Sequence, residues 1–367
     1  MSGKARIIDA GPPTTPSMGP SGEVDKQILM FDSSSGHNMS NSSNQNTFCV
    51  AIDGSGNSYT ALSCVLDVFC TGVHTTTSLE VVHVPEQDVE HVAFDLQPAF
   101  VEKEATKEFE RWNKQLSMYD SHPESLATSF VNASRFKQGQ SVRGTLAYHV
   151  NEVSKPKFLV TGIVGAGNAA ENIGGISDTP GTTMAHNLWC SRCTSIVVVP
   201  SSQQTMVPQH VAAPQKYVVA IDGSGRSHNA FQDVCDLCDA SVDSIVAVHV
   251  LVNQLGSKGA SAAAAVAIEK CYCKFLSGLN MPGRVSYQCV EVDCGPNDQT
   301  NALVGEFIAT FAKQEKATFL AVGVDGAGVW HDSTLQWKAQ QRPAPGRVVR
   351  FLSLSQHAPC SLIVNCT

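Results

Sequence analysis

Two aspartates, Asp53 and Asp222, lie in identical short sequences. Ala-Ile-Asp-Gly-Ser-Gly occurs at 51–56 and again at 220–225, each time after an apolar run and before a helix-like stretch. An apolar strand that turns through glycines into a helix is typical of a nucleotide crevice, because the helix N-terminus presents free N–H groups to anions. A carboxylate on this turn is suited to ribose hydroxyls or a bound cation.

The repeated sequence indicates that the chain is a tandem duplication. Strand-like and helix-like segments alternate in each half, which favours an α/β fold with two doubly wound domains. Each domain is expected to hold a five-stranded parallel sheet in the order 3-2-1-4-5, with helices on both faces. The expected strands are 48–52, 79–84, 127–131, 158–161 and 196–199, then 217–221, 245–250, 284–292, 319–322 and 362–364.

The remaining segments are polar. Residues 1–46 are rich in Ser, Asn, Gly and Pro without periodicity and are expected to form a disordered tail. Residues 201–214 read as a linker. The predicted domains are therefore 47–200 and 215–367.

Three loops should meet where ligands bind such a sheet, beyond the carboxyl ends of the strands. One carries Asp53 or Asp222, and a second follows the strand that ends near Val84 or Val250. The third follows the fourth strand and is rich in glycine, which lets the backbone approach a phosphate. A helix expected after Gly181 or Gly346 would also direct N–H groups at an anion.

These residues resemble two universal stress protein domains in tandem, over nearly all of 47–200 and 215–367. In that family the first strand ends in Ile/Val-Asp-Gly-Ser, which matches 52–55 and 221–224. The second strand ends in His-Val, as at His83 and His249. The last strand follows a His-Ala-Pro-Cys sequence, as at 357–360.

The resemblance implies an ATP-type glycine motif in each half. In the first half the implied nucleotide-binding residues are Asp53, Gly54, Val84, Gly162, Gly165, Gly181, Thr182 and Thr183. In the second half they are Asp222, Gly223, Val250, Gly323, Gly326, Gly346 and Arg347. The aspartates and the valine backbones would hold ribose and adenine, and the glycines and threonines would hold phosphates. Arg347 stands where the family has Ser or Thr, and the segments 166–180 and 327–345 are longer than the family's.

The sequence thus favours a non-catalytic, nucleotide-binding stress-response or regulatory protein, with ATP or AMP, and with Mg²⁺ as a candidate counter-ion. One alternative is a structural adaptor whose glycines only shape turns. A less favoured alternative is a slow enzyme that hydrolyses ATP or transfers adenylate. The sequence contains neither a Gly-x-Ser-x-Gly elbow nor a Walker A motif.

Composition argues against nucleic-acid-binding, membrane-spanning and exported proteins. The net charge of -8 argues against nucleic-acid partners, and no apolar run is long enough for a membrane span. The 13 cysteines lie largely in apolar stretches without an export signal, so a cytoplasmic protein with reduced thiols is expected. Two Cys-x-x-Cys pairs, at 190–193 and 235–238, are interpreted as packing residues rather than a metal site.

The resemblance also bears on assembly. In family dimers the final strands pair across a two-fold axis. Here one such strand ends each half, at 196–199 and 362–364, and we expect them to pair within the chain as an internal pseudo-dimer that buries both sheet edges. Any protein partners cannot be named from the sequence.

Overall fold

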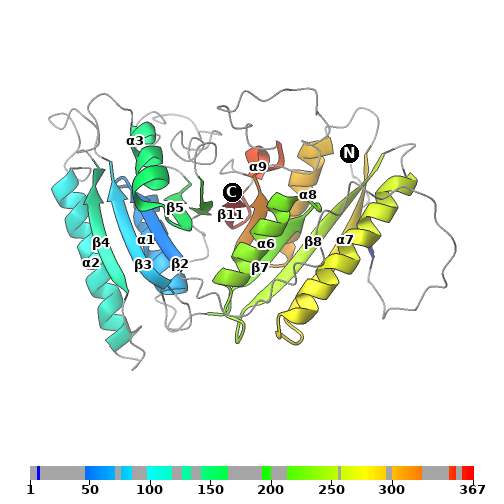
Figure 1. The fold of residues 1–367 in the computed structure, drawn as a ribbon, viewed down its shortest axis with the longest axis horizontal. Coiled ribbons are helices and arrows are strands. Elements are labelled where there is room, and N and C mark those ends of the chain that lie inside the picture. Colours follow the sequence, from blue (N-terminus) through cyan, green and yellow to red (C-terminus); the bar gives the residue numbers. More distant parts are fainter. Residues whose placement is uncertain are drawn as a thin grey trace.

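The computed structural model forms an α/β fold built on one 11-stranded, mostly parallel sheet (Figure 1). It describes residues 6–8, 46–70, 76–84, 97–117, 126–133, 142–163, 192–199, 213–254, 258–294, 300–324, 347–352 and 358–367. The helix expected at 183–190, most of the linker and most of the N-terminal segment lie outside these residues.

The first half contains five strands. In chain order its elements are β2 (Asn46–Ile52), α1 (Gly56–Cys64), a π-helical segment (Val65–Phe69), β3 (Thr76–His83), α2 (Pro98–Ser117), β4 (Ala127–Asn132), α3 (Val142–Tyr148), a second π-helical segment (His149–Ser154), β5 (Phe158–Gly162) and β6 (Thr194–Val198). The strands lie in the order β4-β3-β2-β5-β6, which is the predicted 3-2-1-4-5.

The second half repeats this plan. Its elements are β7 (Lys216–Ile221), α6 (Gly225–Leu237), β8 (Ser244–Gln254), α7 (Lys258–Gly278), β9 (Val285–Cys294), α8 (Thr300–Gln314), β10 (Phe319–Gly323), α9 (Arg347–Leu352) and β11 (Ser361–Asn365). The order β9-β8-β7-β10-β11 is again 3-2-1-4-5. The two halves therefore share one topology, as the repeated sequence predicts.

The N-terminal segment differs from expectation at three residues. Arg6–Ile8 form β1, which pairs antiparallel with β9 at one edge of the sheet. The prediction that 1–46 lacks regular structure is wrong here, because a strand of three residues leaves no periodicity to detect. Asn46 is likewise the first residue of β2.

The helices cover both faces of the sheet. One core cluster packs α1, α2, α6 and α7 against residues such as Phe48 and Tyr217, and it runs without a break through both halves. On the opposite face α3 covers the first half and α8 and α9 cover the second. Strands buried on both faces explain the continuous apolar runs that identify them in the sequence.

The last strands of the two halves pair with each other. β6 and β11 lie antiparallel, with Val197 opposite Leu362 and Ile196 opposite Ile363. This is the strand pairing that the sequence predicts. It removes two sheet edges, which would otherwise present unpaired backbone groups to other chains.

Aromatic rings cross the boundary between the halves. Phe69 lies with its ring centroid 5.5 Å from Phe48 in its own half and 5.4 Å from Phe319 in the other half. Phe319 in turn stacks on Tyr217 at 5.3 Å. Phe69, at the end of the first π-helical segment, therefore contributes to the hydrophobic contact between the halves.

A polar cluster joins α6 to the first half on the same boundary. The Asp233 carboxylate accepts hydrogen bonds from the Thr194 hydroxyl (2.6 Å) and from the Asn365 amide (2.8 Å). One turn further along α6, the Asp236 carboxylate forms an ion pair with Lys157 at 2.6 Å. Asn46 donates to the backbone oxygen of Asp236 at 3.0 Å. These contacts fix the position of α6 against β2, β5 and β6.

We expect Asp233→Asn to stabilise the protein relative to wild type near pH 7, and this advantage to shrink as the pH falls. Burial raises the pKa of Asp233, although the Thr194 and Asn365 hydrogen bonds and Lys157 act in the opposite direction. When folding raises the pKa of a carboxyl, ionisation of that carboxyl destabilises the folded state. Each tenfold change in its acid dissociation constant corresponds to about 1.4 kcal/mol in the free energy of unfolding. Measurement of the free energy of unfolding of wild type and Asp233→Asn between pH 4 and 7 tests this prediction. A stability advantage of the variant that grows as the pH falls would contradict it.

Candidate functional site

The turn after β2 is held by its own polar side chains. The Ser55 N–H donates to Asp53 Oδ1 at 3.0 Å, and Gly54 between them has a φ of 87°. Ser55 then caps α1, because its hydroxyl oxygen accepts from the Ser58 N–H at 3.2 Å. The left-handed conformation at position 54 favours glycine, which explains that residue without reference to a ligand.

The second half repeats these contacts. The Ser224 N–H donates to Asp222 Oδ1 at 2.9 Å, and Gly223 has a φ of 81°. Ser224 caps α6 by accepting from the Ser227 N–H at 3.2 Å. Each copy of the repeated sequence thus places a carboxylate and the N-terminus of a helix beyond the carboxyl end of the first strand. That end of a helix carries a partial positive charge and suits anions.

Gly162 and Gly323 lie at the carboxyl ends of the fourth strands, against these helices. A Cβ on Gly162 would lie 2.9 Å from the carbonyl carbon and oxygen of Asn57 in α1. A Cβ on Gly323 would lie 2.8 Å from the Cβ of Arg226 in α6. Close helix–strand packing therefore requires both glycines, and the resemblance alone assigns them a role with phosphate. Even so, the fold brings Asp53, Gly54 and Gly162 to one edge of the sheet.

The two halves differ at the second strand. β3 ends at His83, so Val84 follows the strand as predicted. β8 instead continues to Gln254, and Val250 lies inside the strand, opposite Val290 of β9. The expectation that a loop starts after Val250 is therefore wrong, because the residues after it extend the ladder with β9.

His83 and His249 tie the first two strands of each half together. The Nδ1 atom of His83 lies 2.9 Å from the backbone oxygen of Ile52, and that of His249 lies 2.7 Å from the oxygen of Ile221. Since a carbonyl can only accept, Nδ1–H must donate in both. Burial lowers the pKa of both imidazoles, so they are neutral near pH 7. They position the Asp53 and Asp222 turns.

Several candidate residues lie outside the described part of the chain. These are Gly165, Gly181, Thr182, Thr183, Gly326 and Gly346. Arg347 is described as the first residue of α9, so a helix does begin directly after Gly346, as predicted. The structure thus places Asp53, Gly54, Val84 and Gly162 at one end of the first half, and Asp222, Gly223 and Gly323 at the corresponding end of the second.

Sequence reasoning missed Asn57 and Arg226. They are equivalent residues in the first turns of α1 and α6, and each packs on the glycine of the fourth strand. Arg226 also donates from Nη1 to the backbone oxygen of Thr367. One signal in the sequence could have identified them: the position of Asn57 and Arg226 is the first after the repeated sequence at which the two copies differ. The second site therefore has a cation where the first has an amide.

The cysteines that suggested a metal site are largely enclosed thiols. Burial raises the pKa of Cys238 to about 12, and it also raises that of Cys235. Within the described ranges, no three His, Cys, Asp or Glu side chains are arranged to hold a metal ion. The same part of the chain contains no helix with the length and apolar character needed to cross a bilayer.

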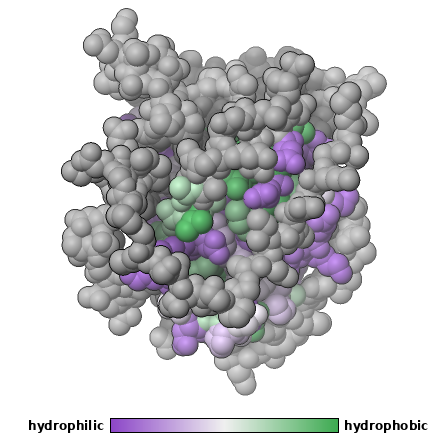
Figure 2. Space-filling view, turned by 90° about the vertical axis from the view of Figure 1, so that its right-hand side faces the viewer, coloured by the Kyte–Doolittle hydropathy of each residue, from purple (hydrophilic) through white to green (hydrophobic). Residues whose placement is uncertain are grey.

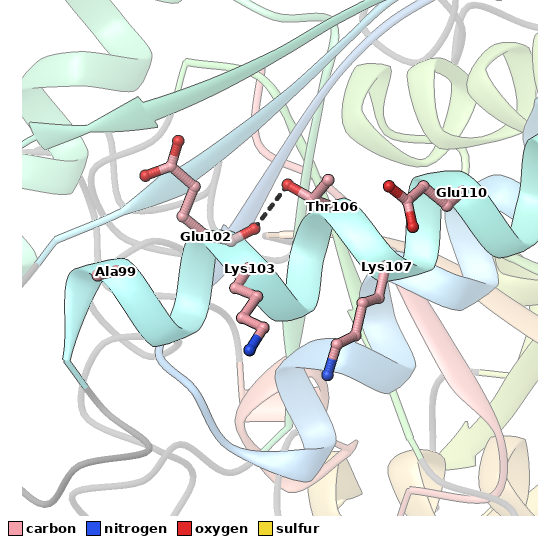
Figure 3. Close-up of a pocket in the computed structure, with 6 residues that line it drawn as sticks. All are labelled: Ala99, Glu102, Lys103, Thr106, Lys107 and Glu110. Atoms are coloured by element: carbon pink, nitrogen blue, oxygen red, sulfur yellow. Dashed lines mark hydrogen bonds between the residues drawn. The ribbon is translucent and has the colours of Figure 1, made fainter.

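A shallow hollow of about 470 Å³ lies on the exposed face of α2 (Figure 3). Its lining residues are Ala99, Glu102, Lys103, Thr106, Lys107 and Glu110. None of them belongs to the sequence-predicted site, and charges of both signs alternate along them. Such a mixture of charges is typical of the solvated face of a helix.

Comparison with known proteins adds a structural likeness. No protein-family model matches the sequence, and no curated protein matches it. The solved structures that this fold resembles include universal stress proteins. One from Archaeoglobus fulgidus is 14% identical and covers 87% of this chain and 95% of its own, with a TM-score of 0.49. One from Lactobacillus plantarum is 16% identical and covers 42% of this chain and 99% of its own, with a TM-score of 0.30.

A third resembling structure is described as a universal stress protein in complex with cAMP. It is 17% identical and covers 42% of this chain and 97% of its own, with a TM-score of 0.26. Two of these three solved chains thus match less than half of the present chain, while the first spans most of it.

Proposed function

We propose that this chain is a nucleotide-binding regulatory protein of the stress-response type, which takes ATP or AMP and performs no catalysis. The observation that carries the proposal is the first-half turn, where Asp53, the N-terminus of α1 and Gly162 lie at the carboxyl edge of the sheet. A carboxylate can accept from ribose hydroxyls, and helix N–H groups can bind phosphate. The adenine nucleotide itself is implied by the sequence resemblance.

We assign the working site to the first half. There β3 ends before Val84, which leaves its backbone beyond the ladder, whereas Val250 lies within β8. In the second half Arg226 is engaged with Thr367, and Arg347 stands in place of a hydroxyl residue. If the nucleotide binds as its magnesium complex, Asp53 is the carboxylate of this turn that could hold Mg²⁺, and the ion would neutralise part of the phosphate charge.

The absence of catalysis is part of the proposal. His83, which lies opposite Ile52 at the end of β3, donates from Nδ1 to the Ile52 carbonyl and is kept neutral by burial. Its other ring nitrogen, Nε2, is buried within the fold, which places it poorly as a general base, because such a base must reach the proton that it removes. We accordingly expect ATP hydrolysis no faster than in a protein-free control. The proposal also places the protein in the cytoplasm, in keeping with the described cysteines, which are present as thiols rather than disulfides.

Calorimetric titration of the full chain with ATP and Mg²⁺ tests the proposal. We expect micromolar binding that falls about 10- to 100-fold in Asp53→Asn, since a hydrogen bond to a charged group contributes about 1.5–3 kcal/mol. The amide keeps an acceptor for the Ser55 N–H, so the turn should survive. Asp222→Asn is the matched control in the second half and should leave this binding unchanged. Equal losses in both variants, or none in either, would contradict the assignment.

A nucleotide-free adaptor is the second candidate. The observation that favours it is the packing of Gly162 and Gly323 against α1 and α6, which explains both glycines without a ligand. It predicts that the purified full chain carries no nucleotide and binds none at millimolar ATP. Extraction of the purified protein followed by chromatography of released nucleotides separates the two candidates.

A further inference from the structure

The two aspartate turns differ in charge at one position. The identical sequences that carry Asp53 and Asp222 are each followed by a different residue, which is Asn57 in the first turn of α1 and Arg226 in the first turn of α6. The first of these turns therefore has one carboxylate and no cationic side chain. The second has a carboxylate and a guanidinium, so its formal charges cancel.

The side chain at this position lies over the carboxyl end of the fourth strand. A Cβ on Gly162 would lie 3.0 Å from the Cβ of Asn57, and a Cβ on Gly323 would lie 2.8 Å from the Cβ of Arg226. The Arg226 guanidinium then reaches the backbone oxygen of Thr367, which follows the end of β11. In the second half this side chain thus extends along the carboxyl edge of the sheet, and Asn57 starts from the corresponding place in the first half.

This edge is where the proposed nucleotide site places phosphate. The nucleotide brings several negative charges, and the Asp53 carboxylate adds another, so the site needs a cation to offset their repulsion. The Asn57 amide can donate hydrogen bonds to phosphate but carries no charge. Mg²⁺ is usually held by one or two carboxylates together with substrate phosphates, and Asp53 with a nucleotide fits that set of oxygen ligands.

We propose that residue 57 determines the form of the nucleotide that the first half binds. With asparagine there, the site takes an adenine nucleotide as its Mg²⁺ complex, whereas a guanidinium there would let it take the free nucleotide. This inference rests on the proposed function, because it concerns the same site. Figure 2 looks onto the second half from its outer end, where hydrophilic and hydrophobic residues lie side by side. The comparison between the halves therefore uses the single side chain that differs in otherwise identical turns.

Calorimetric titration of the full chain with ATP, once in Mg²⁺ and once in EDTA, tests this on wild type and Asn57→Arg. We expect removal of Mg²⁺ to weaken ATP binding at least about tenfold in wild type and less than about threefold in the variant, because a guanidinium makes charge-assisted hydrogen bonds to phosphate. In EDTA the variant should bind ATP about 10- to 100-fold more tightly than wild type. The equivalent position of α6 already accommodates arginine, so the variant should fold. Equal dependence on Mg²⁺ in the two proteins would overturn the proposal.

Two further variants separate the effect of position 57 from that of net charge. Asn57→Gln keeps an uncharged amide and should depend on Mg²⁺ as wild type does. Thr106→Arg adds the same charge on the exposed face of α2 and should also leave this dependence unchanged. A loss of Mg²⁺ dependence in Thr106→Arg as large as in Asn57→Arg would overturn the proposal. Wild type that binds no ATP in either buffer would instead overturn the proposed function, and this inference with it.

Discussion

Replacement of Phe69 by alanine is expected to lower the free energy of unfolding by about 3–5 kcal/mol. The side chain has an exposed fraction of 1% and contacts Phe48 in its own half and Phe319 in the other. Alanine would leave a cavity between two rigid strands, which can close only in part. Chemical denaturation of wild type and variant measures the loss.

The variant should also weaken the contact between the two halves, because the Phe69 ring contacts a ring on each side of their boundary. Phe307→Ala on α8 is the matched control. Phe307 is only partly buried and stacks on Phe311 within the second half, so we expect a smaller loss there. Losses of equal size in the two variants would contradict the role assigned to Phe69.

Replacement of Gly162 by alanine is expected to cost about 1–3 kcal/mol of stability, and valine more. The new Cβ would lie 2.9 Å from the backbone carbonyl of Asn57, and a backbone group cannot rotate away as a side chain can. The first turn of α1 must then shift, which would also displace the Asp53 turn. We therefore expect ATP affinity to fall together with the melting temperature.

Gly56→Ala is the control for this prediction. Gly56 begins α1, and a Cβ there would meet no atom within 4 Å. Its stability should change by less than about 0.5 kcal/mol, as is usual for an exposed position. If Gly162→Ala proved equally harmless, close packing would not explain that glycine.

The sequence predicted the features that local pattern determines. Local pattern located all ten strands of the two halves, most of them as apolar runs, and the repeated sequence located both aspartate turns. The pairing of β6 with β11 followed from the family resemblance. These signals suffice because a strand buried on both faces leaves a continuous apolar run, and because a turn with positive φ calls for glycine.

Features that depend on distant neighbours were not predictable in this way. The packing of Gly162 on Asn57 joins residues far apart in the chain, and a glycine in sequence does not reveal what approaches it. The sequence predicts that a loop follows Val250 because a His-Val pair ends the strand in the family, whereas β9 supplies a partner for the residues that follow. β1 is too short for a periodic signal, and Asp233 finds its partners only when the halves meet.

The most direct test of the central claim is a crystal structure of the full chain grown with ATP and Mg²⁺. The account predicts a nucleotide at the carboxyl edge of the first half, with its ribose beside Asp53 and its phosphates near Gly162 and the N-terminus of α1. Nucleotide bound only in the second half, or only away from both strand edges, would contradict it.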